Sequence, residues 1–183
     1  MRLFYALWPD EQSTARLSVA LASVDGVERM RLVPRGDYHV TLVFVGEVAE
    51  SRLVDLRRIG RGVRGFACAL TFDALEYWPE PAVVVATMGS TPPALTELCR
   101  RLNSELAAVE WIKHTAAEAA ARPTLRAHVT LARKVLQPPV LQAMSVFSWP
   151  ACAFSLVRSD RVGERPVYTV VDTWPLLYET PKP

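Results

Sequence analysis

The tetrapeptide His-Val-Thr-Leu occurs twice in this chain, in HVTLVFVG (residues 39–46) and again in HVTLARKV (residues 128–135). The two copies lie 89 positions apart in a chain of 183 residues, which is close to half of its length. Each copy belongs to a run of apolar and β-branched residues, which is typical of a strand. A unit repeated at this spacing predicts two lobes related by an approximate two-fold axis.

The two halves of the chain have the same expected order of elements: strand, helix, turn, His-Val-Thr-Leu strand, helix and strand. The first half opens with an expected strand over residues 3–8, and the second with one over 82–88. Thr91 and Pro92 mark the start of a helix as a cap followed by a proline at the first helical position. A further short helix is expected around residues 140–144.

We predict an α+β fold with two pseudo-symmetric lobes, each a mainly antiparallel sheet with helices outside, facing a central cleft. A doubly wound parallel sheet is less consistent with the sequence, because no glycine-rich loop follows the first strand. The single domain would span residues 1–183, with lobe 1 roughly over 1–80 and lobe 2 roughly over 81–183. Closing strands at 152–158 and 166–174 could cross between the lobes.

The composition is that of an ordinary globular protein. Hydrophobic residues make up 50% of the chain and charged residues 22%, so a buried core is expected and disorder is not. The formal net charge of +2 points neither toward nor away from nucleic acid. Arginine supplies 18 of the 21 basic residues, and its planar guanidinium group suits phosphate and bases. A general bias toward arginine explains the same count, so composition leaves the partner open.

Three widely spaced cysteines, Cys68, Cys99 and Cys152, form no C-x-x-C pair. Their odd number favours buried free thiols in a reducing compartment over a disulfide framework or a zinc site. No apolar run reaches the ~18 residues of a membrane span, and the opening stretch is too short for a signal sequence. We therefore expect a cytoplasmic protein with no membrane contact and no obligate protein partner. A monomer is the default, since no heptad pattern is evident.

Alternation along a strand places the histidine and threonine of each motif on one face. In the first copy, His39, Thr41 and Val43 would face together. In the second copy, His128, Thr130 and Ala132 would do the same. An approximate two-fold axis would bring both faces to one cleft.

Two imidazoles in one cavity, each beside a hydroxyl, suit phosphoryl chemistry without a metal. With an unperturbed pKa near 6.5, one histidine can accept a proton while the other donates one. Threonine hydroxyls can donate to phosphate oxygens and stabilise the charge of the transition state. Metal catalysis is not expected, because no His-Glu-x-x-His pattern or carboxylate cluster accompanies the motifs. The third histidine, His114, is interpreted as a surface or packing residue.

These motifs give the chain a resemblance to the 2H phosphoesterase superfamily, and within it to the RNA 2′,3′-cyclic phosphodiesterases, also called 2′-5′ RNA ligases. The resemblance extends over nearly the whole chain: RLFYALWP, RLVPRGDYHVTLVFVGEV, LEYWPEPAVVVA, HVTLAR and SLVRS…YTVVDTWPL. One departure is visible. Many relatives carry proline immediately before the second motif histidine, where this chain has Ala127.

The resemblance implies opening of an RNA or nucleoside 2′,3′-cyclic phosphate by water, with a 2′-phosphate as the product and no cofactor. Under this resemblance His39 is the proton donor to the departing 3′ oxygen and His128 is the proton acceptor that activates water. Thr41 and Thr130 would hold the phosphate. Pseudo-symmetry makes the two histidines alike, so the sequence alone does not decide which one is the acid.

Three further positions are candidates for substrate binding. The family has arginine at the place of Arg133, although strict alternation points Arg133 away from His128. Phe4 could offer a stacking surface for the terminal base, with core packing as the alternative and Tyr5 as the reserve candidate. A loop cluster of arginines could contact the RNA backbone, with a solvated surface as the alternative. The cluster comprises Arg158, Arg161 and Arg165.

Three other functions remain open at this point. Ligation would use the same residues, with the 5′-hydroxyl of a second RNA in place of water. A related enzyme of the superfamily would act on a small nucleotide. A non-catalytic module would bind RNA ends by gripping the phosphate with both histidines and would show no turnover.

Overall fold

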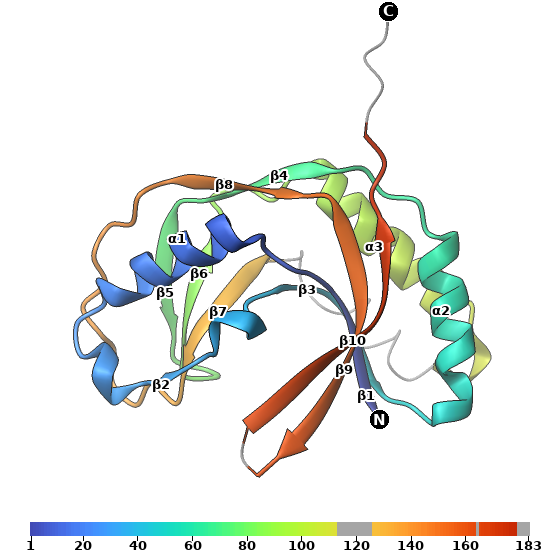
Figure 1. Ribbon diagram of the computed structural model, residues 1–183, viewed down its shortest axis with the longest axis horizontal. Coiled ribbons are helices and arrows are strands. Elements are labelled where there is room, and N and C mark those ends of the chain that lie inside the picture. Colours follow the sequence, from blue (N-terminus) through green and yellow to red (C-terminus); the bar gives the residue numbers. More distant parts are fainter. Residues whose placement is uncertain (113–125, 164, 179–183) are drawn as a thin grey trace, which may run out of the picture.

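The computed structural model describes residues 1–112, 126–163 and 165–178. Its main feature is an eight-stranded antiparallel sheet in the order β10-β9-β1-β3-β7-β6-β5, with β2 paired to β7 (Figure 1). The strands are β1 (Arg2–Leu7), β2 (Arg31–Leu32), β3 (Val40–Glu47), β5 (Ala74–Trp78), β6 (Val83–Thr87), β7 (His128–Arg133), β9 (Ala153–Val162) and β10 (Arg165–Pro175). The predicted α+β class with antiparallel pairing is confirmed.

β3 and β7, the strands with the two His-Val-Thr-Leu motifs, are neighbours in the middle of this sheet. Their register consists of one pair, Val40 opposite Val129. Each of these valines follows a motif histidine, so the pair joins equivalent positions of the repeat. The approximate two-fold axis therefore passes between Val40 and Val129. It divides the sheet into half-sheet A (β10, β9, β1 and β3) and half-sheet B (β7, β6, β5 and the short β2 paired to β7).

The half-sheets do not follow the division of the chain near residue 80 that we expected from the sequence. β5, which ends at Trp78, pairs with β6 in half-sheet B. The C-terminal hairpin of β9 and β10 pairs instead with β1 in half-sheet A. β1 pairs with β3 along one edge only, so its other edge would leave a row of backbone donors and acceptors without partners. Pairing with β9 satisfies these groups.

Among the described residues, three α-helices cover the sheet, and short 3₁₀ turns connect the elements. α1 begins where the Asp10 carboxylate accepts a hydrogen bond from the Ser13 backbone N–H at 2.7 Å, which caps the helix. The helices are α1 (Glu11–Ala22), α2 (Leu53–Gly62) and α3 (Pro93–Ala107), with turns at Val27–Arg29, Arg35–Asp37, Glu50–Arg52 and Glu110–Ile112.

The helices cross over between the half-sheets. α1 follows β1 of half-sheet A but packs against β7 of half-sheet B. α3 follows β6 of half-sheet B but packs against β3 of half-sheet A. Leu17 of α1 and Leu102 of α3 are both fully buried and belong to one continuous core. Each motif strand is therefore supported from behind by the helix of the other repeat.

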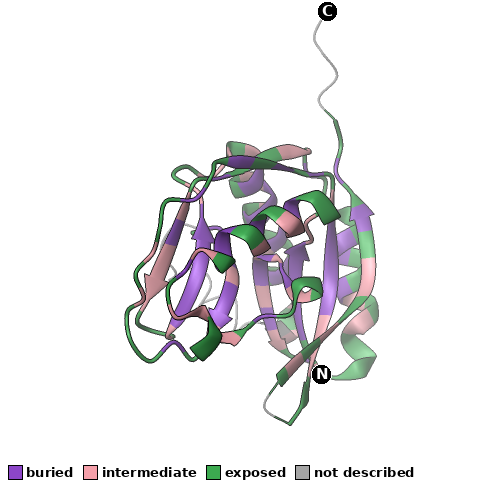
Figure 2. Ribbon diagram, turned by 60° about the vertical axis from the view of Figure 1, so that its left-hand side comes forward, coloured by how far each residue is buried: buried purple, intermediate pink, exposed green. Residues whose placement is uncertain are grey.

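A two-stranded ribbon of β4 (Cys68–Phe72) and β8 (Phe147–Ala151) extends across the helix side of the molecule (Figure 1). It contributes aromatic rings to the core: Phe72 stacks on Phe147 and on Trp149, with ring centroids 5.5 Å and 6.0 Å apart. Figure 2 shows buried residues along the ribbon and the central strands, with exposed residues on the outer faces of the helices.

The prediction of a helix around residues 140–144 is wrong, because this segment has no regular secondary structure. Pro138 and Pro139 precede it and cannot continue a helical hydrogen-bond pattern. Val140 is 65% exposed, whereas Met144 is buried. The segment runs over the surface toward β8 and contributes single side chains rather than a helix face.

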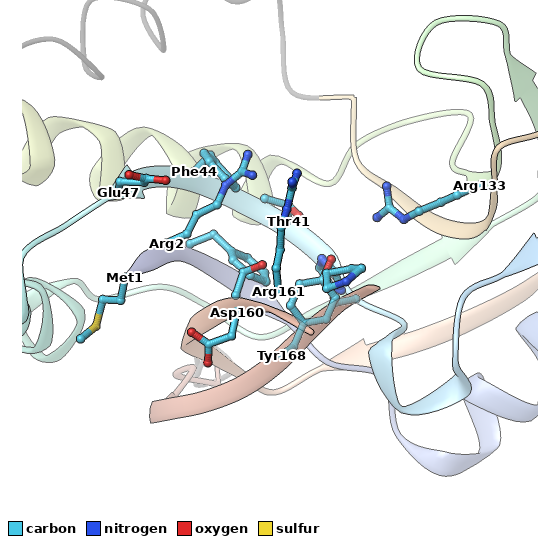
Figure 3. Close-up of a pocket in the computed structure, with 13 residues that line it drawn as sticks. Met1, Arg2, Thr41, Phe44, Glu47, Arg133, Asp160, Arg161 and Tyr168 are labelled. Carbon is cyan, nitrogen blue, oxygen red and sulfur yellow. The ribbon is translucent and has the colours of Figure 1, made fainter. Parts of the chain in front are cut away.

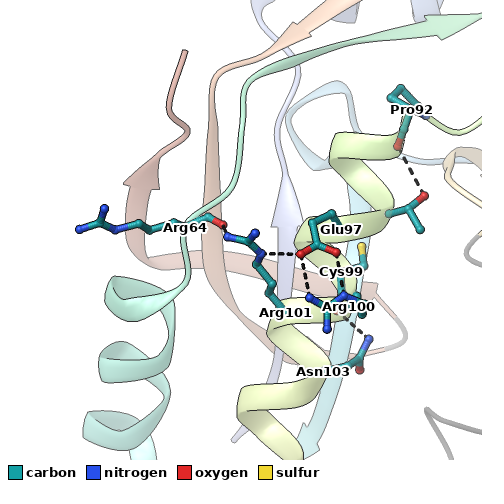
Figure 4. A network of polar contacts seen from close by, with 8 residues as sticks. Arg64, Pro92, Glu97, Cys99, Arg100, Arg101 and Asn103 are labelled. Atoms are coloured by element: carbon teal, nitrogen blue, oxygen red, sulfur yellow. Dashed lines mark hydrogen bonds and ion pairs between the residues drawn. The ribbon is translucent and has the colours of Figure 1, made fainter. Parts of the chain in front are cut away.

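A charged cluster joins α3 to the segment after α2 (Figure 4). The Glu97 carboxylate accepts hydrogen bonds from Arg100 and Arg101, each at 2.7 Å, and the Arg101 guanidinium also donates to the Arg64 carbonyl at 2.8 Å. These arginines hold the pKa of Glu97 down to about 2. The cluster lies on the outer surface and not among the motif residues.

The three cysteines are free thiols. Cys99 is buried, Cys68 is half-buried and Cys152 is exposed, so the prediction of buried thiols holds fully only for Cys99. Within the described ranges, the structure contains no helix that is both long enough and apolar enough to cross a membrane.

Candidate active site

Both motif histidines and both motif threonines line one chamber of about 300 Å³ at the junction of the half-sheets. The antiparallel register through Val40 and Val129 explains this arrangement. It places His39 across from Thr130 and His128 across from Thr41. The remaining wall of the chamber consists of Trp78, Pro81, Val83 and Arg133.

The two histidines have the same backbone partner in the two halves. His39 Nδ1 lies 2.7 Å from the carbonyl oxygen of Asp37, and His128 Nδ1 lies 2.8 Å from the carbonyl oxygen of Arg126. A carbonyl only accepts, so each Nδ1 carries the proton and donates it. In the neutral ring, Nε2 is therefore the atom free to accept a proton from a ligand.

Aromatic rings enclose His39. Trp8 stacks on it with centroids 5.0 Å apart and an interplanar angle of 14°. Phe4 and Tyr168 each lie 5.1 Å from it. The Trp8 indole N–H donates to the Gly36 carbonyl at 3.0 Å, which fixes the stacked ring. Burial among these rings, opposed by the hydrogen bond to the Asp37 carbonyl and aided by the positive charge of Arg133, lowers the pKa of His39 to about 4.

His128 has a more polar environment. Its ring packs against Trp78 with centroids 4.5 Å apart. The Glu76 carboxylate accepts hydrogen bonds from the Trp78 indole at 2.9 Å, from the Thr87 hydroxyl at 2.9 Å and from the Arg126 guanidinium. Burial lowers the pKa of His128, while the Arg126 carbonyl and the charge of Glu76 raise it.

Strict alternation fails after the threonine of each motif, because the strand register shifts there. β3 shifts against β1 between the pairs Tyr5–Val43 and Ala6–Thr41, and β7 shifts against β6 between Val84–Ala132 and Val85–Thr130. The expectation that Val43 faces the cleft is wrong: Val43 is buried in the core and Phe44 lines the cleft.

The equivalent shift in β7 brings Arg133 to the cleft. The expectation that Ala132 faces the cleft is wrong: Ala132 is fully buried, and Arg133 lines the chamber beside His128 and Thr130. A β-bulge of this kind changes which side chains share a face. Phe44 and Arg133 therefore occupy equivalent positions of the two motifs, each five residues after the histidine.

A larger cavity of about 820 Å³ adjoins the chamber and shares His39, Thr41 and Arg133 with it (Figure 3). β1 and β3 provide one wall, and the β9–β10 hairpin provides the other. The lining also includes Met1, Arg2, Phe4, Phe44, Glu47, Ser159, Asp160, Arg161, Pro166 and Tyr168. The site is therefore asymmetric, because the additional space extends from the His39 side.

The remaining sequence candidates have different positions. Phe4 lines the larger cavity but is only 2% exposed, since His39, Phe44 and Tyr168 cover its ring. The Phe4 ring therefore has little free surface on which a base could stack. Its observed role is to pack against the His39 ring. Tyr5 lies in the core, where its hydroxyl donates to the Leu56 carbonyl at 2.7 Å.

The arginines of the C-terminal hairpin separate in the fold. Arg161 lines the larger cavity. Arg158 pairs with Asp160 at 2.7 Å, and Arg165 lines a separate small pocket with Arg133 and Tyr168. His114 lies outside the described residues.

Sequence reasoning missed four residues around the histidines: Trp8, Trp78, Glu76 and Tyr168. All lie on other strands of the same sheet or directly after one, and their placement around a motif histidine depends on the register between strands. The available signal was aromatic: Trp8 and Trp78 each end a strand close to a proline. In the described part of the chain, no group of three or more His, Cys, Asp and Glu side chains is placed to hold a metal ion.

Comparison with known proteins gives consistent results. The family described as LigT-like phosphoesterase matches residues 7–85. An RNA 2′,3′-cyclic phosphodiesterase of Thermus thermophilus is 29% identical over 98% of this chain and 92% of its own length. The protein of the same name from Escherichia coli is 26% identical over 96% of each chain.

Two solved structures have a similar fold over nearly the whole length of this chain. The crystal structure of TT0787 from T. thermophilus has a TM-score of 0.81 and 29% identity, covering 98% of this chain and 100% of that chain. E. coli LigT in complex with ATP has a TM-score of 0.80 and 26% identity, covering 96% of each. With its repeated motif strands and this similarity in sequence and structure, the chain resembles the LigT-like 2H phosphoesterases along nearly its whole length.

Proposed function

We propose that this protein hydrolyses the 2′,3′-cyclic phosphate at an RNA end to a 2′-phosphate, by two-histidine acid–base catalysis and without a metal ion. The observation that carries the proposal is the pair His39 and His128, which line one chamber with each Nδ1 bonded to a backbone carbonyl. Relatives named RNA 2′,3′-cyclic phosphodiesterase support this reaction. Crystal structures of E. coli LigT with ATP and with NADP⁺ support a nucleotide ligand.

The asymmetry of the cleft supports a division of roles between the histidines. In displacement at phosphorus, the attacking and leaving oxygens lie on opposite sides of the phosphorus atom. The leaving 3′ oxygen belongs to the nucleoside, which needs the larger cavity beside His39. Water would then approach from the side of His128. We therefore assign His39 as the general acid and His128 as the general base.

Atoms and protons balance in the proposed step. His128 Nε2 takes a proton from water while the water oxygen bonds to phosphorus. The bond from phosphorus to the 3′ oxygen breaks, and that oxygen takes a proton from His39 Nε2. The phosphate stays on the 2′ oxygen, and the two histidines return to their starting states by exchanging protons with solvent.

Thr41, Thr130 and Arg133 would stabilise the phosphate during this step. The threonine hydroxyls line the chamber opposite the histidines and can donate to non-bridging oxygens. Arg133 lines both the chamber and the larger cavity, so its guanidinium group can pair with the phosphate charge.

The general acid must be protonated before the step. With a pKa of about 4, His39 is neutral at pH 7 in the free protein. A bound phosphate anion would raise this pKa, because an opposite charge nearby favours the imidazolium form, and would also offset the charge of Arg133. His39 would therefore take up a proton when the substrate binds.

Ligation is the second candidate, favoured by the size of the chamber. About 300 Å³ is much larger than the roughly 30 Å³ that one water occupies in the liquid. The 5′-hydroxyl of a second RNA could reach the phosphate from the same side as water and form a 2′-5′ bond. The same histidines would serve both reactions.

The test is turnover of an RNA oligomer with a 2′,3′-cyclic phosphate end, in EDTA, with the product identified by the position of its phosphate. We expect a 2′-phosphate, and we expect His39→Ala and His128→Ala each to lower kcat by about 10²-fold or more. Glu97→Gln is the matched control, since Glu97 lies outside the cleft. High concentrations of 5′-hydroxyl RNA in the same assay would reveal ligation.

Three results would contradict the proposal. Binding of the RNA end without turnover would indicate a non-catalytic module. Turnover of a small cyclic nucleotide but not of RNA would indicate a small-nucleotide enzyme. Loss of turnover in EDTA would indicate a required metal ion.

A further inference from the structure

The larger cavity continues well beyond the residues that would contact the reacting phosphate. Its volume of about 820 Å³ lies toward the upper end of the roughly 300–1,000 Å³ that ligand pockets span. His39 and Thr41 lie at one end. Arg2 lies two residues further along β1 than Phe4, which is about 7 Å along a strand. The cavity therefore has a catalytic end and a distal end.

Arg2 has a defined position at the distal end. Its guanidinium carbon lies 4.5 Å from the centre of the Phe44 ring, which is a cation–π contact. Phe44 in turn stacks on Phe4 with an interplanar angle of 14°. These rings connect the environment of His39 to Arg2 and limit the conformations of the Arg2 side chain.

The opposite wall supplies a second cation. Arg161 of β9 lines the cavity, and Pro166 of β10 lies across from it in the strand register. Figure 3 shows the long side chains of Arg2 and Arg161 reaching into the cavity from different strands, with Arg133 entering from the other side.

The charges at this end favour an anion. Arg2 and Arg161 lie at this end together with Asp160 and Glu47, while Arg133 lies beside the catalytic end. Asp160 is already paired with Arg158, at 2.7 Å, which offsets much of its charge. Glu47 lies across from Arg2 in the register of β1 and β3.

We infer that the distal end binds the nucleotide that precedes the cyclic-phosphate end, with Arg2 and Arg161 contacting the phosphodiester between the two nucleotides. This inference rests on the proposed function, because it places the terminal nucleoside beside His39. The chain of an RNA leaves the terminal nucleoside through its 5′ oxygen, away from the reacting phosphate. The protein therefore distinguishes an RNA end from a mononucleotide by two arginines outside the catalytic set.

The test compares kcat/KM for a 2′,3′-cyclic mononucleotide and for a dinucleotide with the same terminal base. The wild-type protein should prefer the dinucleotide by about tenfold, with a salt dependence of log kcat/KM steeper by roughly 0.7 per phosphate contact. Arg2→Ala and Arg161→Ala should each lower this preference at least threefold and reduce the additional salt dependence. Arg100→Ala, on the outer face of α3, is the control and should retain both.

Equal kcat/KM for the two substrates would overturn the inference, as would Arg2 and Arg161 variants that keep the wild-type preference. If the wild-type protein cleaves neither substrate, the proposed function fails, and calorimetric binding of the two 2′-phosphate products decides the distal site separately. Tighter binding of the dinucleotide product, lost in both variants, would support the site. Equal binding would reject it.

Discussion

His39 and His128 occupy equivalent positions, yet their surroundings differ in polarity. His39 lies among Trp8, Phe4 and Tyr168, whose rings surround it with aromatic carbon. His128 contacts Trp78, whose indole N–H donates a hydrogen bond to the Glu76 carboxylate. A nearby negative charge stabilises an imidazolium, and a cage of aromatic carbon destabilises one. Two chemically identical side chains thus acquire different proton affinities.

Glu76 has a central position on the His128 side. Its carboxylate bonds to Arg126, whose backbone carbonyl accepts the Nδ1 proton of His128. The Arg126 guanidinium also lies over the Trp78 ring, 5.0 Å from its centre. Glu76 therefore acts on His128 through two neighbours, as a positioning residue, and through its charge.

Replacing Glu76 by glutamine should weaken His128 as a base. Loss of the negative charge lowers the pKa of His128, so the acidic limb of kcat/KM against pH should move to lower pH. Looser positioning of the ring should reduce kcat by roughly tenfold. A pH–rate profile with a cyclic-phosphate substrate measures both effects.

Glu97→Gln is the matched control, because Glu97 also pairs with two arginines but lies on the outer surface of α3 (Figure 4). Its pH–rate profile should equal that of the wild-type protein. A Glu76→Gln profile with no shift would show that Glu76 has only a structural role.

At the scale of elements, close contact between α2 and β10 anchors the C-terminal hairpin. Gly60 of α2 faces Trp174 of β10, and a Cβ atom at residue 60 would lie 2.3 Å from two carbons of that ring. Trp174 is buried against Tyr5 and Phe154, so its ring has little room to move. Only glycine allows this approach of helix to strand.

Gly60→Ala should therefore lower the free energy of unfolding by about 1–3 kcal/mol, because the ring or the helix must shift. Gly62→Ala is the matched control in the same helix, since no atom lies within 4 Å of its added Cβ. Gly62→Ala should be neutral or stabilising, as alanine favours a helix more than glycine does. Urea denaturation of both variants measures the difference, and equal stabilities would contradict the expected clash.

At the scale of the whole molecule, the two repeats are interlocked. α1 and α3 each support the motif strand of the other repeat, and the C-terminal hairpin completes half-sheet A. Neither half-sheet has a complete core of its own. The cleft at their junction is therefore held in place by the folding of the entire chain.

The half-buried His39 should make this fold sensitive to acid. The pKa of His39 is about 4 in the folded protein against 6.5 for the unperturbed side chain, so the unfolded chain binds a proton first as the pH falls. The stability from neutral His39 is present above pH 6.5 and is lost progressively down to about pH 4. His39→Gln should reduce the dependence of the free energy of unfolding on pH between about pH 6.5 and pH 4.

The measurement is the free energy of unfolding in urea at several pH values between about 7 and 4, for the wild-type protein and for His39→Gln. Carboxylates present in both proteins contribute equally, so the difference isolates His39. Parallel curves would show that His39 titrates normally in the folded state.

The sequence by itself determined the repeat and the strand character of both motifs, because these follow from local residue patterns. The same patterns determined that His39, Thr41, His128 and Thr130 line the chamber. The antiparallel α+β class followed from the same patterns. Register does not follow from them: a bulge in each motif strand decided that Phe44 and Arg133 face the cleft.

Only the tertiary structure decided how the repeats differ. The aromatic cage of His39 and the Glu76 contacts of His128 come from strands distant in sequence. The C-terminal hairpin enlarges the cleft beside His39 because it pairs with β1 rather than with its own half of the chain. Local propensity carries no information about such pairing, since any open strand edge offers the same backbone hydrogen bonds.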